Sequence, residues 1–154
     1  MTIRPFRPED AERVSEVIRG ALLISNAADY PLEILQPLVQ YYSPEKIRQL
    51  NRERDCLVAE INQKIVGTVA LEADNVVTFF VAPEFQGLGA GARLLAWVET
   101  AARQKGIRRL RLDSSITAAG FYAKMGYRKI KQTTKTGAGA VVEMEKEIAK
   151  KLEK

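Results

Sequence analysis

Hydrophobic residues in the first third of the chain recur at the spacing of helices. Residues 2–6 are predicted to form a short strand, and from residue 8 to residue 23 apolar residues recur every three or four positions, which places them on one face of a helix. Further helices are predicted over residues 32–41 and 44–52, the second because a Ser-Pro pair at its start is typical of a helix N-terminus. The chain is thus predicted to begin with one strand followed by three helices.

The pattern changes to that of β-strands in the middle of the chain. Residues 56–61 and 64–71 are rich in β-branched side chains and flank Asn62-Gln63, so they are predicted to form an antiparallel hairpin. After a turn at Asp74-Asn75, residues 76–81 form a continuous apolar run. Such a run is typical of a strand buried on both faces near the middle of a sheet.

The last third of the chain alternates helices and strands. After a glycine-rich loop, apolar residues form one face of a helix, and a strand follows at residues 110–113. A short helix over residues 118–124 precedes a final hairpin made of residues 127–133 and 141–148. The helix that follows the glycine-rich loop links the strand at residues 76–81 to the strand at residues 110–113, as a crossover between parallel strands. The fold class is therefore α/β, with a mostly antiparallel central sheet and one parallel βαβ crossover.

Composition limits the class of protein. With 154 residues, the chain is long enough to bury one core, and residues 1–154 are expected to form a single domain. The apolar fraction of 46% and the charged fraction of 28% are ordinary for a soluble globular protein. Cys56 is the single cysteine and histidine is absent, which excludes disulfide frameworks, histidine-based catalytic triads and imidazole zinc sites. No metal is expected, and a cytoplasmic location fits this cysteine usage.

Neither a membrane nor a nucleic acid is expected as a partner. The N-terminus lacks the apolar core of a signal peptide, and no segment approaches the run of about 20 apolar residues that a membrane span needs. The net charge of +5 arises from basic residues interleaved with acids, a pattern that usually forms a solvated surface. The densest basic cluster, residues 105–111, straddles a predicted helix end and strand start, so it is a weak nucleic-acid site.

A glycine-rich loop carries the clearest chemical signal. It follows the apolar strand at residues 76–81 and precedes a helix, the position where open α/β sheets place ligands. Gly87, Gly89 and Gly91 alternate, which lets backbone N–H groups approach a ligand closely. No capping side chain precedes the helix, and Arg93 lies in its first turn. Unpaired N–H groups beside a cation suit an anion such as a pyrophosphate.

Two other interpretations of this loop stay open at this point. The loop can be a flexible turn, since glycine pairs are common between strands and helices. A dinucleotide-binding fold would place an acid about where Asp113 ends the next strand, although the G-x-G-x-G spacing and the antiparallel hairpin before it argue against that fold. A Walker loop is excluded because Gly-Lys-Ser and Gly-Lys-Thr do not occur.

Two motifs resemble those of the GNAT superfamily of acetyl-CoA-dependent N-acetyltransferases. Residues 86–91, Gln-Gly-Leu-Gly-Ala-Gly, resemble its signature of Gln or Arg, two residues, Gly, one residue, and Gly or Ala. Residues 115–127 resemble a second motif, in which Asn or Ser precedes a Phe-Tyr pair and then Gly-Phe or Gly-Tyr. The resemblance covers nearly the whole chain and is weakest over residues 21–54. It implies a GNAT-like fold whose parallel strands splay apart to form a cofactor cleft.

The resemblance also implies which residues bind acetyl-CoA as the cosubstrate. Backbone groups of Phe79 and Val81 would pair with the pantetheine arm, and Ser115, where many relatives carry Asn, would contact it. Backbone N–H groups of the glycine loop would hold the pyrophosphate, with Arg93 and Lys124 as further candidates for phosphate contacts. The implied cofactor-binding residues of the loop are Gln86, Gly87, Leu88, Gly89, Ala90, Gly91 and Ala92.

The implied chemistry is direct attack of a primary amine on the thioester. Tyr122 occupies the family's general-acid position and would protonate the leaving thiolate. The general base stays open among Glu72, Asp74, Asp113 and a water relay. An acyl-cysteine route through Cys56 is not expected, because Cys56 lies within a predicted strand away from both motifs.

The acceptor is expected to be a small-molecule or peptide amine. In this family the helices between the first strands usually recognise it, and here Tyr30, Tyr41 and Tyr42 are candidates to line its pocket. A different class also fits the motifs, namely a non-catalytic module that senses acyl-CoA, although the intact Tyr122 argues against it. The oligomeric state stays open, with a homodimer as the alternative that analogy with relatives suggests.

Overall fold

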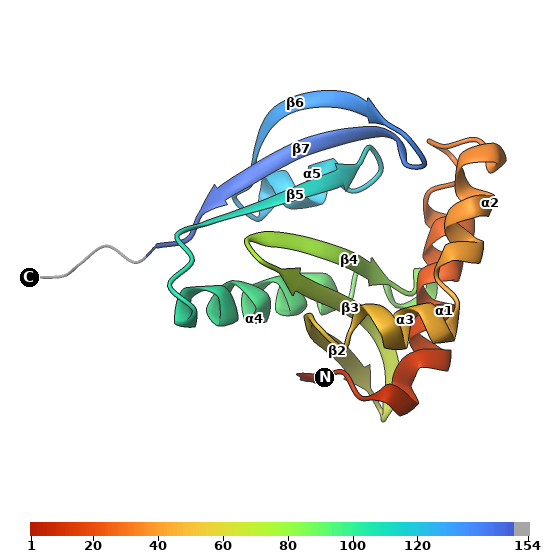
Figure 1. The fold of residues 1–154 in the computed structure, drawn as a ribbon, viewed down its shortest axis with the longest axis horizontal. Coiled ribbons are helices and arrows are strands. Elements are labelled where there is room, and N and C mark those ends of the chain that lie inside the picture. Colours follow the sequence, from red (N-terminus) through yellow and green to blue (C-terminus); the bar gives the residue numbers. More distant parts are fainter. Residues whose placement is uncertain (150–154) are drawn as a thin grey trace, which may run out of the picture.

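The computed structural model describes residues 1–149 and arranges seven strands in one sheet (Figure 1). The strand order is β1-β2-β3-β4-β5-β7-β6, and each neighbouring pair is antiparallel except β4 and β5. The strands are β1 (Thr2–Pro5), β2 (Asp55–Ile61), β3 (Lys64–Glu72), β4 (Asn75–Val81), β5 (Arg109–Ser115), β6 (Arg128–Lys135) and β7 (Gly139–Glu147). This arrangement confirms the predicted fold class.

The helices occupy the segments between the strands. The longer ones are α1 (Ala11–Gly20), α2 (Leu32–Tyr41), α3 (Pro44–Leu50), α4 (Ala90–Gln104) and α5 (Ala119–Lys124), and the short ones are η1 (Pro8–Asp10), η2 (Ala21–Ser25) and η3 (Pro83–Phe85). The helix predicted from residue 8 to residue 23 is therefore three consecutive segments, a 3₁₀ turn, an α-helix and a π-helical turn. Within residues 1–149, no helix combines the length and apolar character that crossing a membrane requires.

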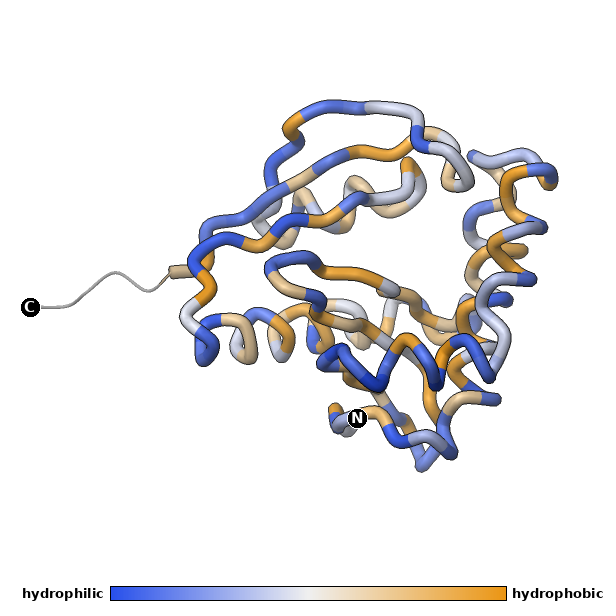
Figure 2. The backbone as a smooth tube through the Cα atoms, in the orientation of Figure 1, coloured by the Kyte–Doolittle hydropathy of each residue, from blue (hydrophilic) through white to orange (hydrophobic). Residues whose placement is uncertain are grey.

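Helices cover both faces of the sheet, so the molecule has two hydrophobic cores. Val58 and Ala59 are neighbours in β2 but belong to different cores, because successive strand side chains point to opposite faces. One core joins α1, α2 and α3 to the sheet, and the other joins α4 and α5 to the opposite face. Hydrophobic positions follow the central strands, whereas the outer strand β6 is mostly hydrophilic along its length (Figure 2).

The two hairpins form where turn residues accept unusual backbone angles. Asn62 and Gln63, between β2 and β3, have φ angles of 51° and 66°, as the two central residues of a tight hairpin turn require. The turn before β4 is shifted by one residue from its predicted place, because Asn75 already pairs with Glu72 and with Arg111. The final hairpin of β6 and β7 agrees with its prediction.

The only parallel pair among the described strands opens almost as soon as it forms. β4 and β5 share one paired position, Asn75 opposite Arg111, where the Arg111 N–H donates to the Asp74 carbonyl oxygen at 3.0 Å. Beyond it β5 pairs only with β7, along Arg109–Ser115. The edge of β4 that faces β5 is thus left without a strand partner, and a cavity begins there.

This opening overturns one expectation from the sequence. The apolar run of β4 was predicted to be buried on both faces, yet only Val76 is buried and Val77 to Val81 are half-buried. The strand does lie in the middle of the sheet. Its side chains are partly exposed because they line the cavity between the splayed strands.

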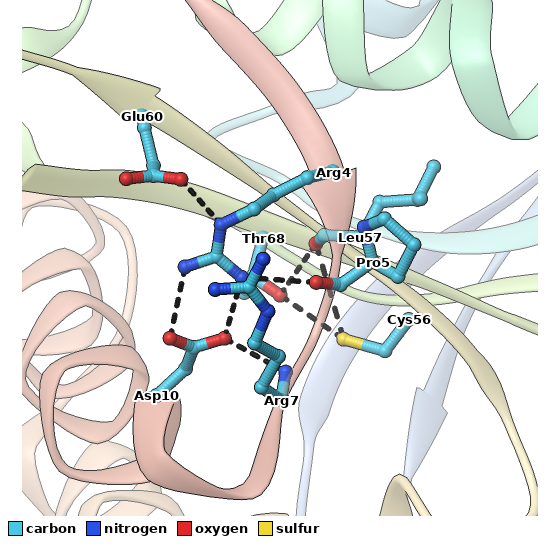
Figure 3. A network of polar contacts seen from close by, with 8 residues as sticks. All are labelled: Arg4, Pro5, Arg7, Asp10, Cys56, Leu57, Glu60 and Thr68. Carbon is cyan, nitrogen blue, oxygen red and sulfur yellow. Dashed lines mark hydrogen bonds and ion pairs between the residues drawn. The ribbon is translucent and has the colours of Figure 1, made fainter. Parts of the chain in front are cut away.

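A polar network fastens β1 to the start of the first helical segment and to β2 (Figure 3). Arg4 donates two hydrogen bonds to the Asp10 carboxylate, at 2.8 and 2.9 Å, and another to Glu60. The backbone N–H of Arg7 also donates to Asp10, at 2.7 Å. Asp10 is only 7% exposed, so the network satisfies a carboxylate that would otherwise be costly to bury.

Candidate active site

A cavity of about 870 Å³ opens where β4 and β5 diverge. Its walls come from α2, β4, the glycine loop, β5 and α5, and from the hairpin that closes β6 and β7. Segments far apart in the sequence therefore meet around one space. This volume lies within the range typical of small-molecule sites.

The glycine loop presents the N-terminus of α4 to this cavity. Gly87 and Gly89 have φ angles of 80° and 89°, conformations that glycine adopts at little cost. Gly89 is the N-cap, and no side chain caps the helix. The first N–H of α4 with a helical acceptor is that of Arg93, 3.1 Å from the Gly89 carbonyl oxygen. The N–H groups before it are thus available to an anion at the positive end of the helix dipole.

Most of the residues predicted for the loop border the cavity, and one does not. Gln86, Gly87, Gly89, Ala90, Gly91 and Ala92 line it, whereas Leu88 does not and is 59% exposed. Arg93 and Lys124 also lie outside the lining, and Arg93 donates to the carbonyl oxygen of Met1 at 3.0 Å.

The side chain of Gln86 holds the loop through two hydrogen bonds. Its Nε2 donates to Ser25 Oγ at 2.8 Å and to the Val81 carbonyl oxygen at 3.3 Å. These contacts join the loop to η2 and to the end of β4. Ser115 lines the cavity and accepts a hydrogen bond from the Ala118 N–H at 3.1 Å, so it also shapes the turn before α5.

A bulge distorts β4 beside the cavity. The pairing with β3 shifts between Thr68 and Ala70, and Thr78 has a φ of 50°. A β-branched residue at this angle is strained and is found where its surroundings hold it. Here Arg54 donates from Nη1 to Thr78 Oγ1 at 3.0 Å. The bulge directly precedes Phe79, which lines the cavity.

Tyr122 lies in an aromatic cluster at the cavity wall. Its ring lies 5.6 Å from that of Phe79, 5.3 Å from that of Phe121 and 5.8 Å from that of Tyr127, each roughly edge-on. No described residue forms a hydrogen bond with its hydroxyl, although Tyr122 borders the cavity. Burial raises the pKa of Tyr122, so the hydroxyl remains a proton donor through the neutral range.

A buried charged network lies behind Tyr122, and sequence reasoning missed it. Glu99 on α4 accepts a hydrogen bond from the Tyr127 hydroxyl at 2.9 Å and one from Lys146 at 3.2 Å. Lys146 also donates to the Met125 carbonyl oxygen at 2.9 Å. The available signal was Glu99 itself, an acid on the otherwise apolar face of its helix. The network fixes the ring of Tyr127, which supports that of Tyr122.

The predicted acids have different positions. Glu72 and Asp113 border the cavity, and each has a basic partner: Glu72 accepts from Arg54 at 2.7 Å, and Asp113 accepts from Lys135 at 2.6 Å. Asp74 does not border the cavity and lies 3.6 Å from Arg111.

Tyrosines close the side of the cavity that faces the helices. Tyr30 and Tyr42 border it, whereas Tyr41 does not and packs edge-on against Tyr42. The Tyr30 hydroxyl donates to the Ala140 carbonyl oxygen at 2.5 Å and accepts from the Ile116 N–H at 2.8 Å. Tyr30 thus joins the segment before α2 to β7 and to the end of β5 across the cavity.

Two other candidate chemistries lack support in the structure. Cys56 is buried outside the cavity lining, and burial raises the pKa of its thiol to about 11, so the nucleophilic thiolate is scarce at neutral pH. Three of the four basic residues at 105–111 pair with acids, namely Lys105 with Asp55, Arg109 with Glu147 and Arg111 with Asp74.

The splayed parallel strands and the glycine-bounded helix start are the features that the resemblance to GNAT acetyltransferases implies. A family model described as an acetyltransferase (GNAT) domain matches residues 26–148. The chain therefore belongs to the GNAT acetyltransferase family. The alternative of a dinucleotide-binding fold is wrong, because the sheet is mostly antiparallel.

Solved structures share this fold. A GCN5-related N-acetyltransferase from Rhodopseudomonas palustris superposes with a TM-score of 0.88 at 26% identity, over 95% of this chain and 94% of that one. The PaiA N-acetyltransferase from Thermoplasma acidophilum, in complex with coenzyme A, gives 0.78 at 24% identity, over 96% and 99%. An aminoglycoside 6'-N-acetyltransferase from Enterococcus faecium gives 0.71 at 16% identity, over 99% and 100%. No curated protein sequence matches the chain.

Proposed function

We propose that the protein is an N-acetyltransferase that transfers the acetyl group of acetyl-CoA to a primary amine. One observation carries the proposal: the uncapped start of α4, the unpaired edge of β4 and Tyr122 all border the same cavity. An anion site, a partner for an extended amide chain and a proton donor are thus arranged around one space. A relative of similar fold is known in complex with coenzyme A.

The cofactor would lie along the gap between β4 and β5. Backbone N–H groups from Gly87 to Ala92 would hold the pyrophosphate, since they precede the first helical hydrogen bond of α4. Backbone groups of Phe79 and Val81 would pair with the pantetheine amides, as an added strand pairs with a sheet edge. Ser115 would contact the same arm from the β5 side.

The reaction would proceed by direct attack. The amine nitrogen forms a bond to the acetyl carbon, the C–S bond breaks, and the electron pair leaves on the sulfur of CoA. The amine gives up one proton and the thiolate takes one, for which Tyr122 is the donor. Its pKa lies above the ordinary value of about 10, because the side chain is buried. Transfer to a thiolate with a pKa of about 8.5 is therefore uphill, and is expected to coincide with C–S cleavage.

The base that receives the amine proton is one of two acids or a water molecule. Glu72 and Asp113 both border the cavity, so either can accept a proton directly or through water. Asp74 is a poorer choice than the sequence suggested, because it lies outside the lining. The acceptor itself would enter from the side of Tyr42 and α2, as a small-molecule or peptide amine.

Replacement of Tyr122 by Phe tests the enzyme against the alternative of an acyl-CoA sensor. The variant Tyr122→Phe removes the proton donor and keeps the ring packing, so thiol release should fall about 100-fold or more while acetyl-CoA affinity is kept. Tyr41→Phe, outside the cavity, is the matched control and should retain full activity. Thiol release can be followed with a chromogenic disulfide, and affinity by calorimetry. Equal turnover in Tyr122→Phe and the parent would remove Tyr122 from the mechanism.

A further inference from the structure

The acceptor end of the cavity carries four charged side chains that cancel one another. Among the described residues that line the cavity, the charged ones are Arg54, Glu72, Asp113 and Lys135. They form two ion pairs, in which Arg54 Nε lies 2.7 Å from Glu72 Oε2 and Lys135 Nζ lies 2.6 Å from Asp113 Oδ2. A polycationic acceptor needs acids that are not already neutralised. This end of the cavity is therefore unsuited to polyamines, and an acceptor that carries both charges fits it better.

Arg54 is the cation placed to select such an acceptor. Its side chain is only 13% exposed, and Nε and Nη1 donate to Glu72 and Thr78. No described residue accepts a hydrogen bond from Nη2, which leaves part of the guanidinium fork available to a carboxylate. Arg54 thus presents donors to the cavity while two contacts hold it in place.

The position of Arg54 would bring a bound carboxylate close to the reacting atoms. Thr78, to which Arg54 donates at 3.0 Å, directly precedes Phe79, whose backbone is proposed to pair with the cofactor arm. A carboxylate on Arg54 would therefore lie close to the thioester. In an α-amino acid one carbon atom separates the carboxylate from the amine, so the amine would be held near the acetyl carbon. The adjacent Glu72 would face the ammonium group.

The lining also carries apolar surface that suits an apolar side chain. Leu35 and Leu38 of α2 line the cavity together with Phe80 and Tyr42. Tyr42 and Phe80 pack edge-on with their centroids 5.9 Å apart. The cavity thus offers both an ion pair and aliphatic and aromatic surface to an acceptor.

We infer that the acceptor is an α-amino acid with an apolar side chain, whose carboxylate binds Arg54 and whose α-amine is acetylated. This inference rests on the proposed function and narrows its acceptor. Lys135 and Asp113 form the second neutral pair of the cavity lining. The product is the N-acetyl amino acid, with CoA released as the thiol.

The test compares amino acids with their amides, which keep the amine and the side chain but lack the carboxylate. Leucine, methionine and phenylalanine are each assayed beside the corresponding amide and beside spermidine, at saturating acetyl-CoA. At least one amino acid should exceed its amide and spermidine about tenfold or more in kcat/KM, because a hydrogen-bonded charge pair is lost with the carboxylate. An amide or spermidine that matches the best amino acid would overturn the inference.

The variant Arg54→Gln distinguishes a loss of carboxylate recognition from a distortion of the β4 bulge at Thr78. It should reduce kcat/KM for the amino acid to about the level of its amide while the amide changes less than about threefold. Arg52→Gln, an exposed neighbour outside the cavity, should leave the ratio of amino acid to amide unchanged. An unchanged ratio in Arg54→Gln contradicts the inference, and so does an equal loss for both substrates, which would mean that Arg54 only supports Thr78.

Measuring the binding of acetyl-CoA distinguishes a wrong acceptor from a wrong proposed function. If calorimetry shows that acetyl-CoA binds but no amino acid is acetylated, the inference about the acceptor is wrong and the cofactor site stands. If acetyl-CoA does not bind, the proposed function fails and the acceptor assignment fails with it.

Discussion

At the scale of single residues, Asp10 makes stability depend on pH. Burial by itself would raise the pKa of Asp10, but the hydrogen bonds from Arg4 and from the Arg7 backbone N–H outweigh it, so the pKa lies below the ordinary value of about 3.9. A lowered pKa in the folded state means that the unfolded chain takes up the proton first. This contribution to stability is therefore complete above about pH 4 and is lost as the pH falls through the folded-state pKa.

The variant Asp10→Asn measures this contribution. It leaves Arg4 without its bidentate partner in a half-buried site, so the free energy of unfolding at pH 7 should fall by about 3 kcal/mol. The difference from the parent should start to shrink below about pH 4, where Asp10 of the unfolded chain takes up a proton, and should vanish below the lower folded-state pKa. Urea titrations at several pH values provide the measurement, with Glu9→Gln, an exposed acid in the same turn, as the control. A constant difference at all pH values would show that charge plays no part.

Residues whose role depends on distant partners could not be assigned from the sequence. Thr78 is an ordinary strand residue by its side chain, and its strained φ of 50° depends on the bulge and on Arg54. Gln86 belongs to the recognised motif, yet its side chain holds Ser25, 61 positions earlier. Tyr122, by contrast, was predicted to reach the cavity and borders it, although its neighbour Phe121 borders it too, with the two rings 5.3 Å apart.

At the scale of elements, the backbone conformation of Gly89 at the start of α4 can be tested with a single methyl group. Gly89 has a φ of 89° and nothing within 4 Å of an added Cβ, so alanine there meets backbone strain and no steric clash. Gly89→Ala should cost about 1 kcal/mol of stability and weaken acetyl-CoA binding by redirecting the N–H groups of the loop.

Gly106→Ala is the matched control for that variant. Gly106 follows the other end of α4, has a φ of 80° and is equally open. It should therefore lose similar stability with unchanged acetyl-CoA affinity, as measured by denaturation and calorimetry. If both variants bind acetyl-CoA like the parent, the loop does not hold the pyrophosphate.

Most elements were predictable because their patterns are local. The hairpin of β2 and β3, the helix α2 and the crossover of β4, α4 and β5 follow from periodicity and turn residues. The burial of β4 was predicted wrongly, because an apolar run has the same sequence whether a neighbouring strand or a ligand cavity lies beside it. The division of residues 8–25 into three helical segments was also missed, since Leu22 and Leu23 continue the helical spacing in the sequence and the wider hydrogen bonds of a π-helical turn leave no local signal.

At the scale of the whole molecule, the cavity exists because two strands part and distant segments close around the gap. β5 leaves β4 after one paired position, and Tyr30 joins the helical side to β7 through its hydroxyl. No local pattern encodes this closure. The family resemblance predicted the gap correctly, whereas the two ion pairs in its lining became visible only when the partners of Arg54 and Lys135 were located.

The melting temperature measured with acetyl-CoA shows whether the glycine loop and the cleft bind this cofactor. A ligand at 100 times its dissociation constant adds about 2.7 kcal/mol to the stability of the folded state, which for a chain of this size raises the melting midpoint by about 5 to 10 °C. Such a rise, reduced in Gly89→Ala and retained in Gly106→Ala, is the predicted result. The absence of any shift with acetyl-CoA, longer acyl-CoAs or CoA would contradict the account, because the glycine loop would then be only a turn.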